Sequence, residues 1–398
     1  MRIGIDASSL GGGGGITHLT ELLRHTDVRA SGIDAITVWG SEATLARLPH
    51  EFPWLQLEPQ PELARGLRAR VAWQRGKLSE LASAKCDVLF VPAGAYGGSF
   101  HPYVTMCRNM LPFDLREAAR YGVSRMFLRL LILRFAQKRT FRHADGMIYL
   151  NERVRELVGE RGKRKTTVIP HGISDRFRFA PRAQRPIAAY DREHPFTILY
   201  TSIVDVYKHQ WNVAEAALQL RAEGLPIVLR LAGGTYEPAM KRLQRVLARD
   251  TESVVRFDGE IAHAELPQLY RDADLFVFAS TCENMPNILI EAMAAGLPIA
   301  CSSRAPMPDF LGDAGVYFEP TSIAHTARAL RQLITDEALR ATLAERAAAR
   351  AAQYSWERCA RETFAFLADV ASPRAEDSPR EVRLGRKVDG VADRAAAD

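Results

Sequence analysis

The sequence has few cysteines and no long hydrophobic run. Its five cysteines are scattered without a CxxC pair, so neither a disulfide framework nor a zinc site is expected, and a reducing cytoplasm is favoured. No stretch approaches the roughly 20 apolar residues that span a bilayer, because even MFLRLLILRF at 126–135 is interrupted by two arginines. The N-terminal apolar run is too short for a signal peptide.

Two nucleotide-binding signatures are also missing. Residues 11–15 are GGGGG, but Ile16, Thr17 and His18 stand where a G-x-G-x-x-G dinucleotide fingerprint needs its last glycine. Beyond RGKRKTT at 161–167, no basic stretch with interleaved aromatics is present. Nucleic acid is therefore not expected as a partner.

What is present is an ordinary globular mixture of residues with an uneven charge. The 398 residues are 47% hydrophobic and 25% charged, which suits two domains. Residues 1–177 hold 26 Lys and Arg against 17 Asp and Glu, a charge of +9, whereas 178–398 hold 27 against 30, a charge of −3. The basic first half is expected to meet something anionic, such as a phosphate-bearing lipid or a membrane surface.

Short β-rich runs alternate with helical runs along the chain, which predicts βαβ units and parallel sheets. In the first half we expect strands at 1–7, 35–40, 86–92, 103–107, 146–150 and 166–170, with helices at 16–26 and about 115–142. In the second half we expect strands at 196–202, 226–234, 254–259, 275–280, 298–302 and 314–320, with helices at 209–223, 237–250, 264–273, 287–296 and 322–351.

The break between the two series lies in 171–194, which is rich in Pro, Arg and Asp. We expect an α/β protein with an N-terminal Rossmann-like domain over 1–175 and a second Rossmann-like domain over 176–353. A helix over 354–370 is expected to pack back on the first domain. The charged tail, 371–398, is expected to be disordered.

Glu283 and Glu291 flank a loop that leads from a strand into a helix, which is expected to begin near Asn287 and to end before Gly296. Ligands of doubly wound sheets bind in such loops, and helix N–H groups favour phosphate. A carboxylate can accept hydrogen bonds from vicinal hydroxyls. Two carboxylates around an anion-binding loop suit a nucleotide sugar. The alternative is that Glu291 faces solvent and Glu283 caps the loop.

The segment 283–320, ENMPNILIEAMAAGLPIACSSRAPMPDFLGDAGVYFEP, closely resembles the E-x7-E region of the retaining family 4 glycosyltransferases of bacterial surface-polysaccharide synthesis. The resemblance implies a GT-B-like fold, with two Rossmann-like domains facing across a cleft, and a reaction without metal or cofactor. It implies that Glu291 holds the donor ribose and Glu283 touches the donor sugar. The donor is also expected to meet the loop residues Asn284, Met285, Pro286, Asn287 and Ile288, of which Pro286 has no N–H to offer.

Lys208 follows a strand and opens a helix, so its ammonium can reach a diphosphate. The resemblance implies that Lys208 stabilises the leaving group, and the alternative is an ordinary surface lysine. Ser202, at the end of the same strand, is assigned to the donor site. Relatives often carry an arginine five residues before the lysine, where this chain has Ile203.

The segment TMCRNMLPFD at 105–114 is a further candidate for the cleft. Relatives often have a His-Asp pair there, and this chain has Arg108 and Asn109. Both are assigned to the catalytic site. A guanidinium can neutralise phosphate but cannot act as a base, because it stays protonated. The alternative for Arg108 is a structural salt bridge, and His171 near the hinge is expected to be structural.

Glycines mark two further loops of the expected donor site. Gly14 and Gly15 follow the first strand and allow close backbone approach to a phosphate or an acceptor, and in similar proteins this loop closes over the cleft. Gly233 and Gly234 end a later strand and are expected to lie under the nucleotide base. For the first loop the alternative is a floppy surface segment.

The helix expected over 123–143 combines apolar residues with six Arg and Lys side chains. We expect its apolar residues to lie in the core and its cations to face water. The alternative is that this helix lies on an anionic membrane, which the charge of the first half also fits.

These features predict a hexosyltransferase that moves a sugar from a nucleotide-sugar donor to a saccharide or lipid-linked acceptor of cell-surface polysaccharide, either lipopolysaccharide O-antigen or exopolysaccharide. The second domain would bind the donor and the first the acceptor, in the cytoplasm or at the inner face of the membrane. Two alternatives stay open. One is a nucleotide-sugar epimerase of GT-B shape, and the other is a non-catalytic, membrane-associated scaffold.

Overall fold

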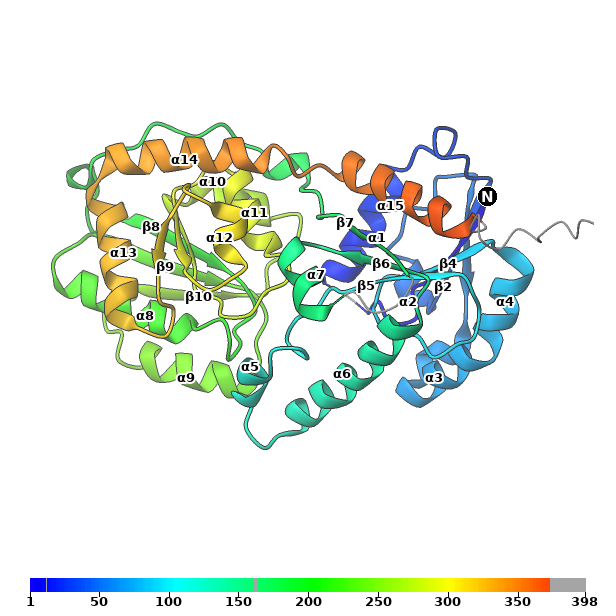
Figure 1. The fold of residues 1–398 in the computed structure, drawn as a ribbon. Coiled ribbons are helices and arrows are strands. Elements are labelled where there is room, and N and C mark those ends of the chain that lie inside the picture. The colour runs from blue at the N-terminus through cyan, green and yellow to red at the C-terminus, as the bar shows by residue number, and fades with distance from the viewer. Residues whose placement is uncertain (12, 160–163, 373–398) are drawn as a thin grey trace, which may run out of the picture.

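The computed structural model describes residues 1–11, 13–159 and 164–372. The tail predicted to be disordered, 371–398, lies outside the described residues apart from Ala371 and Ser372, and so does part of the basic segment 161–167. Two α/β lobes lie side by side, as Figure 1 shows. The alternation of strands and helices in the sequence predicted this pair of parallel sheets, and the prediction is confirmed.

The N-terminal lobe is built on a seven-stranded parallel sheet in the order β3-β2-β1-β4-β5-β6-β7. Its strands β4, β5 and β6 are buried along their whole length, as a parallel sheet covered by helices on both faces requires. The strands are β1 (Arg2–Asp6), β2 (Ala35–Gly40), β3 (Leu55–Pro59), β4 (Val88–Val91), β5 (Tyr103–Met106), β6 (Gly146–Tyr149) and β7 (Lys165–Val168). The helices are α1 (Gly14–Arg24), α2 (Glu42–Leu45), α3 (Leu67–Arg75), α4 (Lys77–Lys85), α5 (Leu115–Ala119), α6 (Arg125–His143) and α7 (Glu152–Val158).

The C-terminal lobe repeats this plan with a six-stranded parallel sheet in the order β10-β9-β8-β11-β12-β13. The strands are β8 (Phe196–Thr201), β9 (Ile227–Ala232), β10 (Val255–Gly259), β11 (Leu275–Phe278), β12 (Ile299–Ser302) and β13 (Val316–Phe318). The helices are α8 (Gln210–Ala222), α9 (Glu237–Leu247), α10 (Leu266–Asp272), α11 (Asn287–Ala294), α12 (Met307–Leu311), α13 (Ile323–Thr335) and α14 (Glu337–Ala351).

The chain crosses between the lobes twice. The first crossing contains the short 3-10 helices Asp175–Phe177 and Ile187–Ala189. The second leads from α14, which covers the C-terminal lobe, to α15 (Trp356–Ala371), which lies on the N-terminal lobe against α1, β4 and β5 (Figure 1). Gly172 lets the two crossings meet, because a Cβ there would lie 2.2 Å from the backbone nitrogen of Trp356.

The helix predicted over about 115–142 is in fact two helices, α5 and α6. Gly122 has a φ of +63°, a left-handed conformation that ends a helix. Ser124 then starts α6, since its hydroxyl accepts a hydrogen bond from the Phe127 N–H at 3.2 Å. The long apolar and basic stretch is therefore divided into two separate helices.

The prediction that the apolar residues of α6 lie in the core is wrong for one side of the helix. The buried side includes Leu130 and Phe141. On the opposite side Leu128 is 59% exposed, Ile132 60% and Phe135 75%. The reason is that α6 lies along the edge of the lobe, so only one of its sides has a protein partner. Of the described helices, none is both long enough and apolar enough to span a bilayer.

Candidate functional site

The predicted residues gather where each sheet reverses its strand order. In the C-terminal lobe the reversal lies between β8 and β11, and in the N-terminal lobe between β1 and β4. Ligands of such sheets bind beyond the carboxyl ends of the strands at this point. The loops that leave β8 and β11 carry Lys208 and Glu283, the loop that leaves β5 carries Arg108, and Gly14 begins α1 after the loop that leaves β1.

Lys208 and Glu283 form a buried ion pair. The Lys208 Nζ contacts Glu283 Oε1, and Lys208 is only 4% exposed. The same ammonium lies 5.1 Å from the ring centre of Tyr207 and 5.0 Å from that of Phe278. Lys208 is therefore not an ordinary surface lysine. Two predicted site residues from adjacent loops come into direct contact.

Glu291 lies on α11, which begins at Asn287 and is followed by Gly296 with a φ of +64°, as the sequence predicted. Its Oε2 accepts a hydrogen bond from the Tyr270 hydroxyl at 2.8 Å. Burial raises the pKa of the Glu291 carboxyl to about 7, although the Tyr270 hydrogen bond and the charge of Arg176 act in the opposite direction. This carboxylate is therefore partly buried and close to half protonated at neutral pH.

The loop between the two glutamates is tied to the N-terminal lobe. The Asn284 side-chain amide donates to the Cys107 carbonyl at 2.7 Å, and the Asn151 amide donates to the Asn284 carbonyl at 2.7 Å. The Met285 sulfur accepts a hydrogen bond from the His171 N–H at 3.0 Å. The side chains of Asn284 and Met285 thus hold the two lobes together.

Arg108 connects the glycine loop with the beginning of α11. Its Nη2 donates to the Gly14 carbonyl at 2.6 Å. A Cβ on Gly15 would lie 3.1 Å from Arg108 Nη1, and one on Gly14 would lie 3.9 Å from Asn287 Nδ2. Burial lowers the pKa of the Arg108 guanidinium to about 10, so it stays charged. Within the described part of the chain it has no carboxylate partner, so the salt bridge considered for it is not formed.

Two histidines complete this polar cluster, and the sequence pattern missed one of them. The rings of His18 and His171 lie 4.5 Å apart. Burial, reinforced by the Arg108 charge, lowers the pKa of His171 to about 3, and burial also holds the pKa of His18 well below its usual value. Both rings are therefore neutral. The available signal for His18 was its place one turn into the helix that follows the glycines.

Several buried polar atoms of this cluster have no hydrogen-bond partner among the described residues. They include both ring nitrogens of His18 and of His171, Arg108 Nε and Asn287 Oδ1. Buried polar groups normally find partners. Four side chains that converge on one place with unused donors and acceptors are typical of a site that receives a polar ligand.

The segments that follow β8 and β9 are in close backbone contact. Gly233 has a φ of +147°, and a Cβ there would lie 2.2 Å from the Ser202 carbonyl oxygen. Gly234 has open space around its Cβ position. Ile203, where relatives often carry an arginine, is 43% exposed. Gly233 is therefore required by close backbone packing, whereas Gly234 is free to face a ligand.

Three other predicted residues have local roles. Asn109 is exposed, and its side-chain oxygen accepts the Leu111 N–H at 3.0 Å, which forms a tight turn. Pro286 stands at the N-cap position of α11, and Ile288 is partly buried in its first turn. These contacts bring neither Asn109 nor Ile288 to the Lys208–Glu283 pair.

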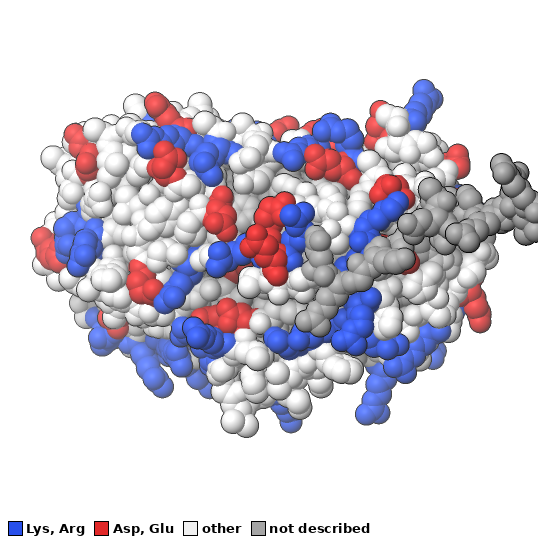
Figure 2. Space-filling view, viewed as in Figure 1, with Lys and Arg blue, Asp and Glu red and all other residues white. Residues whose placement is uncertain are grey.

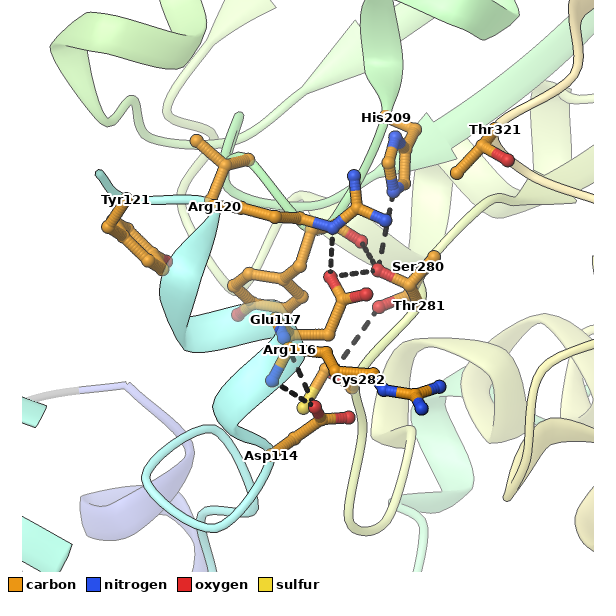
Figure 3. Close-up of polar contacts among 12 residues, drawn as sticks. Asp114, Arg116, Glu117, Arg120, Tyr121, His209, Ser280, Thr281, Cys282 and Thr321 are labelled. Carbon is orange, nitrogen blue, oxygen red and sulfur yellow. Dashed lines mark hydrogen bonds and ion pairs between the residues drawn. The ribbon is translucent and has the colours of Figure 1, made fainter. Parts of the chain in front are cut away.

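A cleft of about 1040 Å³ lies between the lobes, and of the residues predicted from the sequence Glu283 alone lines it. Figure 3 shows one wall, formed by α5 and the loop after β11. The Glu117 carboxylate accepts a hydrogen bond from the Thr281 hydroxyl at 2.6 Å and pairs with Arg120 at 2.7 Å. Asp114 accepts the N–H of Arg116 at 3.1 Å and so caps α5. Asp114 ends the segment 105–114 that the sequence predicted for the cleft, whereas the sequence pattern gave no sign of Glu117, Arg120 and Thr281.

No group of three or more His, Cys, Asp or Glu in the described ranges is arranged to hold a metal ion. An Asp-x-Asp triplet, 272–274, precedes β11, but Asp274 is engaged in the fold. Its carboxylate accepts hydrogen bonds from the Thr197 N–H at 2.8 Å and the Tyr190 hydroxyl at 2.9 Å, and it pairs with Arg182.

Comparison with known proteins agrees with this geometry. Residues 186–350 match the family model described as glycosyl transferases group 1. Over 123 residues the chain is 33% identical to the O-antigen chain mannosyltransferase B of Escherichia coli, which covers 31% of this chain and 32% of the relative. Over 250 residues it is 30% identical to the glycogen synthase of Mycobacterium tuberculosis, which covers 60% of this chain and 57% of the relative. The chain thus spans less than two thirds of either relative.

A solved structure of HepE from Anabaena in complex with UDP is similar over nearly the whole chain. Its TM-score is 0.66 at 18% identity, and the match covers 92% of this chain and 99% of HepE. This likeness confirms the GT-B-like fold that the sequence predicted. Residues 186–350 therefore resemble the glycosyl transferases group 1 domain, and they lie in a fold of two facing Rossmann-like domains.

Proposed function

We propose that this protein is a retaining glycosyltransferase that transfers a hexosyl group from a nucleotide-sugar donor to a saccharide or lipid-linked acceptor of cell-surface polysaccharide. The observation that carries the proposal is the buried Lys208–Glu283 pair at the strand-order reversal of a group 1 domain. The O-antigen mannosyltransferase among the relatives supports the choice of lipopolysaccharide O-antigen or exopolysaccharide as the product.

In this proposal the C-terminal lobe holds the donor. The Glu291 carboxylate accepts hydrogen bonds from the ribose hydroxyls, and Glu283 accepts them from the sugar. Lys208 contacts both Glu283 and the departing diphosphate, where its positive charge stabilises the leaving group. Gly234 lies beside the base. The enzyme then gains its rate from orientation and from charge stabilisation, and metal independence stays a prediction.

Arg108 supplies the second cation that Ile203 does not provide. Its guanidinium is buried without a carboxylate and lies against Gly14 and Gly15. A phosphate oxygen would satisfy its unused N–H and compensate its charge. Because His18 and His171 are neutral, they can add hydrogen bonds to this phosphate but no charge.

The acceptor enters from the N-terminal lobe, at the inner face of the membrane. The exposed apolar side of α6 supports this location, since Leu128, Ile132 and Phe135 stand beside Arg125 and Arg129. Such a basic amphipathic surface suits peripheral attachment to anionic lipid.

The test is a transfer assay with a panel of labelled nucleotide sugars, in which nucleoside diphosphate release is measured with and without lipid-linked acceptor. We expect acceptor-dependent release, retained anomeric configuration in the product, and unchanged rates in EDTA. Glu283→Gln and Lys208→Ala should each lower the rate at least about a hundredfold, as loss of a transition-state charge contact does. Isomerised nucleotide sugar without acceptor would support the epimerase instead, and binding without turnover the scaffold.

A further inference from the structure

We infer that the cleft beside Glu283 is built for an acceptor that carries a phosphate or diphosphate ester, and that four cations of the N-terminal lobe bind this group. This inference rests on the proposed function, because it identifies the acceptor of the same reaction. It adds a chemical class of substrate and the residues that recognise it.

The cleft has an excess of positively charged side chains. Among the residues that the structure describes, eight Arg and Lys side chains line it, against the three carboxylates of Asp114, Glu117 and Glu283. All three carboxylates are already engaged, by the α5 backbone, by Arg120 and Thr281, and by Lys208. Glu117 and Glu283 are thus neutralised by cations and Asp114 is held by the α5 backbone, so the cleft keeps an excess of positive charge.

Four of these cations are already engaged, the first being Arg120, which pairs with Glu117. Arg134 donates to the carbonyls of Pro112 and Phe113, Arg164 donates to those of Phe141 and Gly159, and Arg304 pairs with Glu319. The other four have no ion pair within the part of the chain that the structure describes, and they are Arg116, Lys138, Arg142 and Arg153. Four unpaired cations around one cleft attract an anion of high charge.

The four unpaired cations lie on one side of the cleft. The four cations come from α5, α6 and α7, so they surround the cleft on the N-terminal side, while Glu283 stands on its opposite side. Lys208 and Arg108, which we assign to the donor diphosphate, do not line this cleft. The anion held here is therefore a second one, next to the sugar that Glu283 contacts. That is the place of the acceptor.

An exposed apolar surface of α6 lies next to these cations and indicates what the anion is attached to. On α6 the exposed side runs from Leu128, Ile132 and Phe135 to Lys138 and Arg142, so an apolar surface leads directly to the cations. Figure 2 shows Lys and Arg side chains along the lower edge of the molecule, on both sides of an uncharged surface where α5 leads into α6. An amphiphile with a phosphate head fits this arrangement, in which an apolar surface lies next to a group of cations. A water-soluble phosphate ester would use the cations alone.

Arginine favours phosphate in particular. Three of the four cations are arginines, whose planar guanidinium groups donate two parallel hydrogen bonds to phosphate oxygens. Phe113 and Phe141, stacked with centroids 5.8 Å apart, also line the cleft and offer an apolar surface for a sugar ring or the start of an alkyl chain.

The experiment measures binding of two probes by calorimetry, dodecyl phosphate below its micelle concentration and glucose 1-phosphate. Wild-type protein is compared with R142A/R153A, with R116A/K138A, and with the control R328A/R361A, which removes the same charge from exposed positions outside the cleft. UDP binding is measured in parallel and is expected to be unchanged in all variants. Each cleft variant should bind dodecyl phosphate at least about tenfold more weakly, because each charged hydrogen bond lost has a sizeable effect.

If both probes bind and both lose affinity in the cleft variants, the phosphate alone is recognised. If only dodecyl phosphate binds and loses affinity in the cleft variants, the acceptor is lipid-borne. Dodecyl maltoside, which has the same alkyl chain without phosphate, should then bind equally to all variants. The inference is overturned if neither probe binds, or if the cleft variants and the control behave alike. Because UDP binding and transfer are separate readouts, failure of this inference is distinguishable from failure of the proposed function.

Discussion

Glu291 keeps its proton more tightly in the folded protein than in the unfolded chain, since burial raises its pKa from 4.5 to about 7. Between these two values the folded state binds one more proton than the unfolded state, so stability falls as pH rises through this window. The cost is roughly 3 kcal/mol above pH 7, at about 1.4 kcal/mol per unit. Such a cost is typical of a site that needs the charge for its ligand.

Glu291→Gln should therefore melt at a higher temperature than wild type at pH 8 and at about the same temperature at pH 5. The same variant should lose the thermal shift that the donor nucleotide produces, because an amide accepts ribose hydroxyls poorly. In wild type, donor affinity should rise about tenfold from pH 6 to pH 8, as the ionised fraction increases around a pKa near 7. A donor affinity independent of pH would contradict this role.

The Lys208–Glu283 pair should show strong coupling in a double-mutant cycle. Lys208→Met leaves a buried carboxylate without its partner, and Glu283→Gln leaves a buried ammonium, so each should lower the free energy of unfolding by about 3 kcal/mol. The double variant K208M/E283Q buries no unpaired charge and should be no less stable than either single variant. Urea unfolding of the four proteins measures this, and additive losses would show that the two charges do not depend on each other.

At the scale of single residues, the sequence was enough to predict the residues that belong to local motifs. Glu283, Glu291 and Lys208 stand at fixed places around strand ends and helix starts, so a chain pattern is enough to find them. His18 and the unpaired cations Arg142 and Arg153 come from separate elements. Only tertiary packing brings His18 to His171 and Arg108, and Arg142 and Arg153 to the cleft, and no spacing in the sequence encodes that.

At the scale of elements, the exposed apolar side of α6 leads us to predict that the protein binds membranes through this helix. Leu128, Ile132 and Phe135 are exposed on one side, and each would gain about 1.5–3 kcal/mol on full burial in lipid. We expect wild-type protein to sediment with phosphatidylglycerol vesicles, less so with phosphatidylcholine, and less at high salt. The triple variant L128S/I132S/F135S should bind at least about a hundredfold more weakly.

The control for α6 replaces exposed apolar residues elsewhere. Leu67 is 67% exposed and Ile323 38% exposed, and neither belongs to α6. L67S/I323S should sediment with vesicles as wild type does. Equal binding of the triple variant and wild type would remove α6 from the membrane contact.

The element pattern also explains which predictions failed. The strong strands of the C-terminal lobe and α11 were found from their apolar runs and flanking glycines. The break at Gly122 was missed because one glycine in a long apolar and basic stretch is a weak signal. The core assignment of α6 failed because periodicity shows that a helix is amphipathic but not which of its sides has a partner.

At the scale of the molecule, two parallel sheets follow from the alternation of strands and helices, but their mutual position does not. Specific hydrogen bonds join the lobes. The Tyr121 hydroxyl donates to Asp205 at 2.8 Å, and the Asn284 amide donates to Cys107 at 2.7 Å. Each joins residues far apart in sequence, so the closed arrangement of the cleft became visible only in three dimensions.

Helix α15 makes the stability of the N-terminal lobe depend on the C-terminal end of the chain. Its Trp356, Phe364 and Leu367 are at most 5% exposed, and the helix packs on α1, which carries His18 of the site. A chain that ends at Ser355 should lose on the order of 5–10 kcal/mol from the N-terminal lobe. Calorimetry should then resolve two transitions, with the N-terminal lobe unfolding first, whereas a chain that ends at Ser372 keeps all these contacts and should melt as wild type does. A single unchanged transition in the shorter chain would mean that α15 adds nothing to the lobe it covers.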